Sequence, residues 1–561
     1  GAFLAGFGRL IRRHRVEPEK AFGHFAGLFF GTLGLPIAIF RVKRDLFGDE
    51  LALKSKEGLL VLLASVAVAV TLGTLISLTL RALARARGTA FLARAWGGPL
   101  VAFVTVLGFV GLASARPSTD MVASGRALSA APADAKNVIV IVVDTLRADA
   151  LGAYGYSKAR TPNLDRFARD AVRYDRHFAN ASWTRPSFAS IMTGRYPSNH
   201  GVMALQAPLP EEVKTIAEAF AEGGYYTSGI VTNTNVSPVY NFHQGFDEYA
   251  YLEPSFVLGA NDLQSKLLVV QLMRRVIQRF VPVAPGSAYQ DAETVNERVF
   301  TWLDRAKAST GENPFFLFVG YMDPHDPYFE HPYNTVAYDK ASHQEPELSE
   351  AERLRELYDG EVAYFDEHFG RLIDDLRRRG LYDDTTIVVT SDHGEEFGEH
   401  GGFWHGVTLY DEQIRMPLFV KPAGGAHAGT VVRHFTQSVD LLPTLLAENG
   451  LAAVEGVQGG LLTTPSPHVF AEESHHDNVL RSLRVLDNGE EVKLITANAG
   501  NPRGVEEREL YRVGSDPGER RNVATEEAAT TARLETALDE AEAHYREGAA
   551  RPAENVEMDC D

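Results

Sequence analysis

The segment NVIVIVVD, residues 137–144, decides the fold of this chain. Its run of apolar, mostly β-branched residues predicts a strand that is buried on both faces, as in a parallel sheet covered by helices. The run ends in Asp144, at the kind of strand end where open α/β sheets bind ligands. The segment TIVVTSDH, residues 386–393, repeats the pattern and ends in Asp392 and His393. Two strands that both finish in metal-ligating residue types predict a metal site at one edge of a sheet.

A third segment, SWTRPSFASIMTGR at residues 182–195, carries a candidate nucleophile. Thr184 stands two residues before a proline, which is typical of a first helical turn. A helix N-terminus has unpaired N–H groups and the positive end of the helix dipole, so it attracts anions. Thr184 could simply cap this helix, which is a common role for threonine. The two acidic strand ends favour the alternative, in which its hydroxyl attacks a phosphate or sulfate group.

Outside these three segments, the sequence after residue 136 predicts an alternation of helices and strands. Residues 213–221 have a helical pattern and residues 226–232 have a strand pattern. A charged helix is expected over residues 349–379, and an Ala/Glu-rich helix after residue 525. This order predicts an α/β fold with a mostly parallel sheet flanked by helices on both faces.

In order and spacing these segments resemble the sulfatase branch of the alkaline phosphatase superfamily, over residues 137–524. Besides the Thr184 segment, the resemblance is carried by DTLRADALGAYGY (144–156), TPNLDRFARDAV (161–172), DPHDPY (323–328), SDHGEEFGEHGGFWHG (391–406) and ELYRVGSDPGERRNVA (509–524). It implies an alkaline-phosphatase-like catalytic domain that binds a divalent metal.

The resemblance also implies roles for individual residues. The metal-binding set corresponds to Asp144, Thr184, Asp392 and His393, and Thr184 is also at the nucleophile position. His325 and His405 match positions that contact the transferred anionic group or protonate the leaving oxygen. Weaker candidates for substrate binding are Asn233, Asn235, His200 and His400. The two histidines could equally contact the residues that form the site and not the substrate itself.

Four departures from the family pattern bear on the substrate. Sulfatases have cysteine or serine at the nucleophile position, which is oxidised to formylglycine, and Thr184 cannot become that aldehyde. Phe188 replaces an arginine, Thr145 replaces the second aspartate of a pair, and His393 replaces an asparagine. A site with fewer carboxylates and one imidazole favours zinc or manganese, with calcium or magnesium possible.

These departures favour cleavage or transfer of phosphate or phosphonate esters and diesters. The alternatives are a sulfuric ester hydrolase, a phosphoethanolamine or phosphoglycerol head-group transferase, and a protein that binds metal or anions without catalysis. The threonine nucleophile is similar to that of the head-group transferases. The segment at residues 509–524 instead resembles sulfatases and phosphonate-ester hydrolases, so hydrolysis and transfer remain open.

The N-terminal part of the chain has a different composition. Residues 1–126 carry 16 Lys+Arg and 7 Asp+Glu, whereas residues 127–561 carry 39 and 67. Three stretches of about 20 residues without charged side chains, long enough to cross a bilayer, follow one another. They cover residues 21–40, 58–80 and 95–115. The predicted organisation is a membrane region at 1–116, a linker at 117–136, a catalytic domain at 137–550 and a tail at 551–561.

We therefore expect a multi-pass protein of the cell membrane with its catalytic domain outside the cytoplasm. An amphipathic segment at residues 263–280, with four basic side chains, is compatible with a helix on the lipid surface or with one packed on its own domain. The acidic catalytic region argues against nucleic acid as a partner, because phosphate contacts require the opposite charge. The expected partners are the lipid bilayer and a phosphate- or sulfate-ester substrate.

Overall fold

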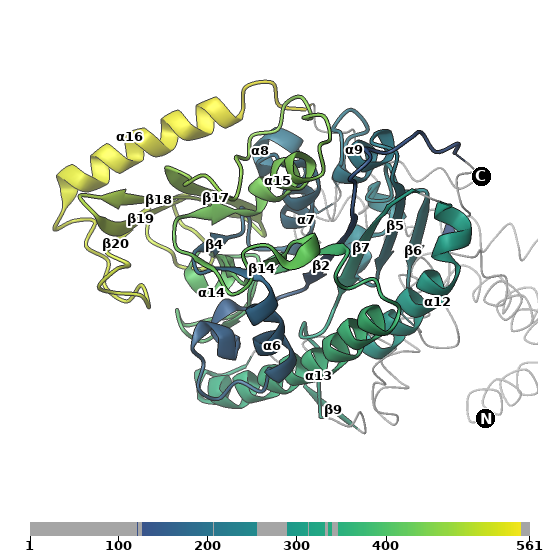
Figure 1. Cartoon of the computed structure of the whole chain (residues 1–561). Helices are drawn as coiled ribbons and strands as arrows, with labels where there is room; N and C mark the ends of the chain where they lie inside the picture. Colours follow the sequence, from purple (N-terminus) through teal and green to yellow (C-terminus); the bar gives the residue numbers. More distant parts are fainter. Residues whose placement is uncertain are drawn as a thin grey trace, which may run out of the picture. The chain divides into compact units, whose positions relative to one another are not determined.

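In the computed structural model, the described residues all belong to one of the two units into which the chain divides (Figure 1). The described residues are 120–121, 126–205, 207–254, 289–311, 313–330, 335–338 and 346–550. The three predicted membrane stretches, the amphipathic segment 263–280 and the tail lie outside them. Within the described ranges, no helix is both long and apolar enough to span a bilayer. Residues 120–121 of the predicted linker form strand β1.

A nine-stranded sheet is the centre of the unit, in the order β1-β6-β5-β7-β2-β10-β14-β3-β15. The five strands from β6 to β10 are mutually parallel, and β14 is antiparallel to its neighbours β10 and β3. The bounds are β1 Asp120–Met121, β2 Asn137–Val143, β3 Val172–Tyr174, β5 Tyr226–Val231, β6 Glu248–Tyr251, β7 Phe315–Tyr321, β10 Thr385–Ser391, β14 Leu418–Lys421 and β15 Val431–Val432. This confirms the predicted mostly parallel sheet.

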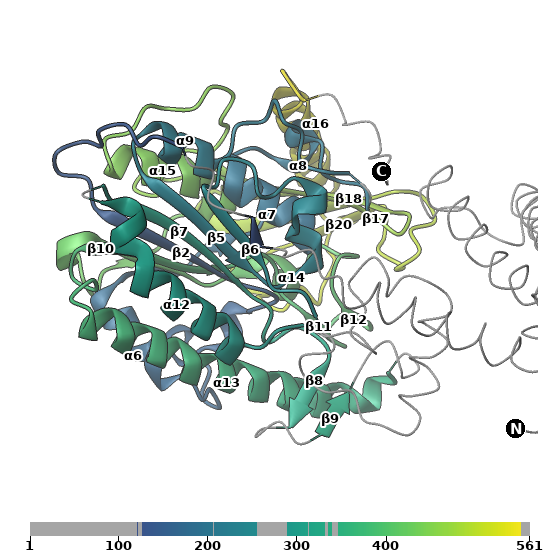
Figure 2. The ribbon, with the colours of Figure 1, turned by 90° about the vertical axis from the view of Figure 1, so that its right-hand side faces the viewer.

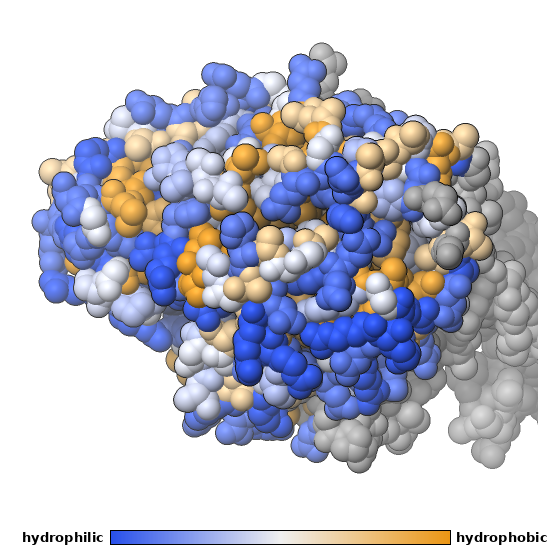
Figure 3. Space-filling model, in the orientation of Figure 1, coloured by the Kyte–Doolittle hydropathy of each residue, from blue (hydrophilic) through white to orange (hydrophobic). Residues whose placement is uncertain are grey.

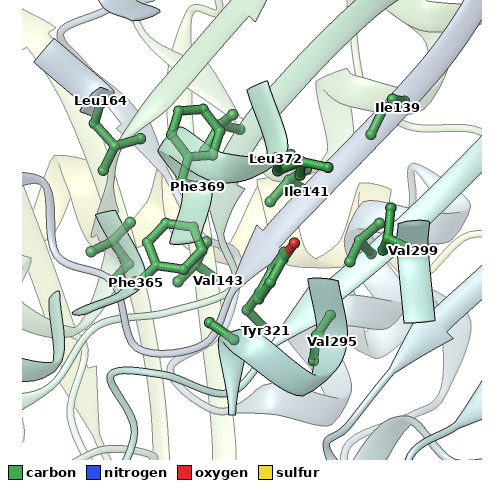
Figure 4. Close-up of a cluster of buried hydrophobic side chains, with 14 of the residues drawn as sticks. Ile139, Ile141, Val143, Leu164, Val295, Val299, Tyr321, Phe365, Phe369 and Leu372 are labelled. Carbon is green, nitrogen blue, oxygen red and sulfur yellow. The ribbon is translucent and has the colours of Figure 1, made fainter. Parts of the chain in front are cut away.

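Helices cover both faces of this sheet because side chains of β2 alternate between two hydrophobic cores. Ile139, Ile141 and Val143 pack with α6 (Pro162–Asp170), α12 (Ala292–Thr310) and α13 (Ala351–Arg378), as Figure 4 shows. The intervening valines of β2 pack with α7 (Thr184–Thr193), α9 (Ile216–Glu222) and α15 (Leu441–Glu448). Figure 2 shows the two helical layers on opposite sides of the sheet.

A second, antiparallel sheet lies toward the C-terminus and is covered by a helix (Figure 1). Its strands are β17 (His468–His475), β18 (Asn478–Asp487), β19 (Glu490–Ala497) and β20 (Arg508–Tyr511), and the helix is α16 (Ala528–Tyr545). The smaller elements are β4 (His177–Phe178), β8 (Tyr328–Glu330), β9 (Thr335–Tyr338), β11 (Glu396–Phe397), β12 (Phe403–Trp404), β13 (Arg415–Met416), β16 (Thr436–Gln437), α8 (Pro197–His200) and α14 (Asp411–Ile414). The face seen in Figure 3 is mostly hydrophilic, with scattered small apolar patches.

Candidate active site

Thr184 is the first residue of α7, as the sequence predicts. Trp183 precedes it in an extended conformation, and Pro186 falls in the first turn. Every residue of this helix is buried, so the surrounding protein holds the helix and its first residue, Thr184, in a fixed position. The hydroxyl of Thr184 lies 3.3 Å from Nε2 of His393. The unpaired N–H groups of the first turn give this position a positive potential, which suits a hydroxyl that must lose its proton.

Asp144 and Asp392 are neighbours because of the register between β2 and β10. These parallel strands pair Val143 with Ser391, so the next residue on each strand is an aspartate. Nε2 of His393 lies 3.7 Å from Oδ1 of Asp144 and 3.3 Å from Oδ2 of Asp392. Ligand atoms of the three residues all lie within 4.8 Å of one another. The structure thus brings together the three side chains that the two strand ends predict as metal ligands.

The chemistry of this cluster fits a divalent cation. Oδ1 of Asp144 and Oδ2 of Asp392 are buried and have no hydrogen-bond partner. Nδ1 of His393 is 3.0 Å from the carbonyl of Gly394, which leaves Nε2 as the atom that can offer a lone pair. Burial raises the pKa of Asp392 to about 7, and burial together with Asp392 raises the pKa of Asp144 well above its ordinary value. A bound cation would remove the electrostatic cost of two adjacent buried carboxylates.

Asn233, in the loop after β5, completes this arrangement. Its Nδ2 donates to Oδ2 of Asp144 at 2.5 Å and to the Thr184 hydroxyl at 3.5 Å. Its Oδ1 accepts the backbone N–H of Asn235 at 2.7 Å, which fixes the orientation of the amide. A donor directed at both the carboxylate and the hydroxyl would stabilise negative charge on Thr184. Asn233, one of the weaker candidates from the sequence, therefore lies within hydrogen-bond distance of both Asp144 and Thr184.

His405 and His325 lie beside His393. The ring centroids of His405 and His393 are 4.4 Å apart, and those of His405 and His325 are 5.0 Å apart. Nδ1 of His405 is 2.9 Å from Oε1 of the buried Glu395, and a carboxylate partner favours a protonated imidazole. Burial, and then the neighbouring His405, lower the pKa of His325 to about 3. His325 is therefore held in its neutral form at neutral pH.

A cleft of 650 Å³ leads to Thr184. Its walls include Trp183, Asn235, Trp404, His405, His475 and Arg503. The indole of Trp183 stacks on His475 from the end of β17, with ring centroids 4.7 Å apart and an interplanar angle of 23°. The C-terminal sheet therefore forms part of the wall, opposite the edge of the main sheet. An aromatic wall with a few polar groups is typical of a pocket for an ester of moderate size.

Arg185, the residue after the nucleophile position, is a buried cation that the sequence patterns did not single out. Its Nη2 donates to Oδ1 of Asn235 at 2.9 Å, and its guanidinium lies 3.5 Å from the ring centroid of Tyr240. No carboxylate in the described part of the chain forms an ion pair with it. Burial lowers its pKa to about 10. Asn235 lines the cleft, so this positive charge lies directly behind the wall beside Thr184.

Two predicted residues, His200 and His400, are held elsewhere. His200 is buried between α7 and α8, where Nε2 lies 3.2 Å from Oγ of Ser190, and burial lowers its pKa to about 3. His400 stacks on Tyr410 with ring centroids 3.6 Å apart, and its Nδ1 lies 2.5 Å from Oε1 of Glu412. Burial opposes protonation of His400, but the bond and charge of Glu412 outweigh it and raise the pKa. Neither imidazole is among the residues that line the cleft.

The mostly parallel sheet and the Asp-Asp-His cluster at its edge are those of a hydrolase of the alkaline phosphatase superfamily. The family model described as Sulfatase matches residues 136–450, which is more than half of the chain, and the chain belongs to the sulfatase family. Enzymes of this family depend on a metal and act on ester substrates.

Characterised relatives span several substrates. The multifunctional alkaline phosphatase superfamily protein PehA of Trinickia caryophylli is 27% identical over 381 residues, covering 55% of this chain and 73% of that protein. The ulvan-active sulfatase of Formosa agariphila is 28% identical over 356 residues, covering 60% and 66%. The choline-sulfatase of Rhizobium meliloti is 24% identical over 356 residues, covering 57% and 68%.

Solved structures show the same fold. The phosphonate monoester hydrolase of Agrobacterium radiobacter superposes with a TM-score of 0.57 at 22% identity, covering 73% of this chain and 96% of that one. The phosphonate monoester hydrolase of Silicibacter pomeroyi gives a TM-score of 0.55 at 24% identity, with the same two coverages.

Proposed function

We propose that this protein hydrolyses phosphate or phosphonate esters or diesters with Thr184 as the nucleophile. The observation that carries the proposal is the position of the Thr184 hydroxyl, at the N-terminus of α7 and 3.3 Å from Nε2 of His393. Threonine cannot supply the formylglycine that sulfatases use, so an alkoxide is the nucleophile that this position can provide. PehA and the two phosphonate monoester hydrolases lend the proposal further support, since they are similar to this chain in sequence or in fold.

Asp144, Asp392 and His393 would hold the metal, with zinc or manganese favoured and calcium or magnesium possible. When bound, such a cation lowers the pKa of a hydroxyl and polarises an ester oxygen. Asn233 would donate to the oxygen of Thr184 as it becomes negative. Attack of this oxygen on phosphorus breaks the bond to the leaving alcohol and forms a covalent ester on Thr184.

The neighbouring His405 and His325 would have separate roles in the reaction. His405, whose Nδ1 is held by Glu395, would give a proton from its ring to the leaving oxygen. His325 has a strongly lowered pKa, so it would stay neutral. Its Nδ1 lies 2.6 Å from the carbonyl of Asp326 and carries the proton, so its Nε2 would accept a hydrogen bond from a hydroxyl of the substrate. After the alcohol leaves, His405 has lost its proton and can take one from the water that cleaves the Thr184 ester. The same residue thus serves as acid and then as base.

The decisive experiment measures how fast the purified full chain hydrolyses four matched nitrophenyl substrates, with zinc or manganese added. The substrates are a phosphate monoester, a phosphodiester, a phosphonate ester and a sulfate ester. We expect turnover of phosphorus esters by the wild type, loss with Thr184→Ala, and partial retention with Thr184→Ser. Thr193→Ala is the matched control, because Thr193 is a buried threonine of the same helix whose hydroxyl bonds to the Ala189 carbonyl. Phosphorus-ester turnover that survives in Thr184→Ala would rule out this nucleophile.

Sulfate-ester hydrolysis is the second candidate, favoured by the family and by the ulvan-active and choline sulfatases among the relatives. A preference for the sulfate ester in the same assay would select it. Head-group transfer is distinguished by mass spectrometry of Thr184. A covalent adduct that accumulates until an acceptor alcohol is added indicates a transferase, and an adduct that turns over in water indicates a hydrolase.

We also propose that residues 1–116 anchor the protein in the cell membrane, with the catalytic domain outside the cytoplasm. The support is the three uncharged stretches in the sequence, each about the length that a bilayer requires. Protease treatment of intact cells tests this orientation. We expect loss of the domain that contains Thr184, whereas complete protection until the cells are lysed would contradict it.

A further inference from the structure

Four arginines surround one aspartate in a second pocket, of 350 Å³. None of its lining residues belongs to the cleft at Thr184. The lining consists of Tyr154, Arg173, Asp175, Arg176, Arg415 and Arg433.

The pocket lies at the ligand-binding edge of the main sheet. Strands β3 and β10 are both antiparallel to β14, so they run in the same direction, and β15 is parallel to β3. Asp175 follows the end of β3 and Arg433 follows the end of β15. These residues are therefore at the same edge as Asp144 and Asp392, where open α/β sheets bind ligands. Between β10 and β3 there is only β14, which corresponds to roughly 10 Å along the sheet.

The single carboxylate is shared among the arginines. Nε of Arg173 donates to Oδ1 of Asp175 at 2.9 Å, and Nε of Arg433 lies 3.6 Å from Oδ2. Arg415 reaches only the backbone oxygen of Asp175, at 3.2 Å. One negative charge therefore faces three guanidinium groups. Like charges held together in this way repel one another unless an anion joins them.

Neighbouring carboxylates do not neutralise the excess positive charge of the four arginines. Nη2 of Arg176 lies 3.4 Å from Glu491, but Glu491 is also bound by the buried Arg484. Asp149 feels the charge of Arg415 but is bound by Arg147 at 2.6 Å. Asp411 also feels the charge of Arg415 but is bound by Arg484 and, at 3.0 Å, by Lys493. These three acids are shared with basic side chains outside the pocket, so the excess positive charge of the pocket remains.

We propose that these four arginines bind a phosphate or sulfate group, either a free ion or the terminal ester of a larger molecule. Guanidinium groups present paired N–H donors that match the oxygens of such a group. Residues 127–561 carry 39 Lys+Arg and 67 Asp+Glu, so a positive pocket is a local exception on an acidic region. That contrast directs an anion to this place. The pocket has room for a tetrahedral anion and part of the group esterified to it.

The test is equilibrium dialysis of the full chain against radiolabelled inorganic phosphate. EDTA is present to remove metal from the Thr184 site, and the measurement is repeated with Thr184→Ala. We expect one saturable site in both. Arg433→Gln, at a side chain that is 74% exposed, should weaken binding by about three- to tenfold. Asp175→Asn should strengthen binding by a similar factor, because it removes the anion that competes for the arginines. Arg353→Gln, at an exposed side chain 3.7 Å from Glu350, is the control and should change nothing.

The opposite signs of the two variants separate a binding site from a purely structural cluster. Absence of saturable binding in the wild type would overturn the proposal, and so would an unchanged affinity in Arg433→Gln or a shift of both variants in the same direction. Tighter binding of glycerol phosphate than of inorganic phosphate would identify an ester of a larger molecule as the ligand, and equal binding would identify the free ion. Because metal is absent and Thr184 is dispensable here, this result is independent of catalysis.

Discussion

Glu473 provides a test of how the region around Thr184 is stabilised. Its carboxylate, from β17, accepts hydrogen bonds from the backbone N–H and the hydroxyl of Ser182, at 3.2 and 2.8 Å. It also accepts from the backbone N–H of Ser474 at 2.8 Å. Ser182 stands two residues before Thr184, so this side chain joins the C-terminal sheet to the start of α7. Burial raises the pKa of Glu473 to about 8.

This shift fixes the sign and size of a pH effect on stability. The folded state keeps the proton that the unfolded chain releases near its ordinary pKa of 4.5. The contribution of Glu473 is therefore fully present below about pH 4.5 and is lost as the pH rises toward 8. At about 1.4 kcal/mol per pKa unit, the loss between pH 5 and pH 8 amounts to at most about 4 kcal/mol. Glu473→Gln has no charge to gain and should not show this loss.

The assay is urea unfolding of the wild type and Glu473→Gln at about pH 5 and about pH 9, followed by circular dichroism. At the lower pH the folded wild type holds Glu473 as a neutral acid, which glutamine resembles in shape and charge, so the two proteins should differ least in stability there. The free energy of unfolding of the variant should then fall by less between the two pH values than that of the wild type. The exposed Glu540→Gln serves as the control. Equal pH dependence in wild type and Glu473→Gln would refute the reasoning.

Three further predictions concern the active site. Arg185→Met should lower kcat/KM for a dianionic phosphate monoester more than for a monoanionic sulfate ester, with partial recovery in Arg185→Lys; equal losses on both esters would contradict an electrostatic role. Asn233→Ala removes a donor to a carboxylate and should lower kcat/KM by about ten- to a hundredfold, measured on the best phosphorus ester, whereas a purely structural residue would change the melting temperature alone. Removal of metal with EDTA should abolish turnover and lower the melting temperature, and zinc or manganese should restore both; full activity in EDTA would exclude the metal site.

The sequence could predict the main sheet because the run at residues 137–143 is buried on both faces. Alternate side chains of β2 enter two separate cores, which requires helices on both sides. The clustering of Asp144, Asp392 and His393 was predictable for the same reason. Two central strands of a parallel sheet end at one edge, so acids placed immediately after β2 and β10 meet once the strands are adjacent. The adjacency itself came from the resemblance to known proteins, since neither strand contains information on its neighbour.

Sequence patterns of this kind could not predict contacts between segments that are distant in the chain. Arg185 directly follows Thr184 in the sequence. The position of its guanidinium group is set by contacts with Asn235 and Tyr240, which lie about fifty residues away in the chain. Glu395 stands in a motif that was recognised, yet its bond to His405 depends on how the intervening hairpin folds. The predictions for His200 and His400 rest on the same kind of motif, but the contacts of their rings with Ser190 and Tyr410 could not be predicted from it.

Backbone strain at Thr145 explains how one oxygen of Asp392 is left without a hydrogen bond. Thr145 has a φ of 58°, a conformation that is unfavourable for a β-branched residue and costs roughly 1–3 kcal/mol. The side-chain hydroxyl of Tyr358 holds it there by donating to the Thr145 carbonyl at 2.8 Å. In this conformation the N–H of Thr145 donates to Oδ1 of Asp392 at 3.3 Å, and the N–H of His393 donates to the same oxygen at 2.9 Å. Two backbone donors thus occupy Oδ1, while Oδ2 faces Nε2 of His393 with no hydrogen-bond partner. A residue with a relaxed backbone at this position would lose the bond from its N–H and leave the carboxylate held by one backbone donor, so the strain serves to orient the Asp392 side chain.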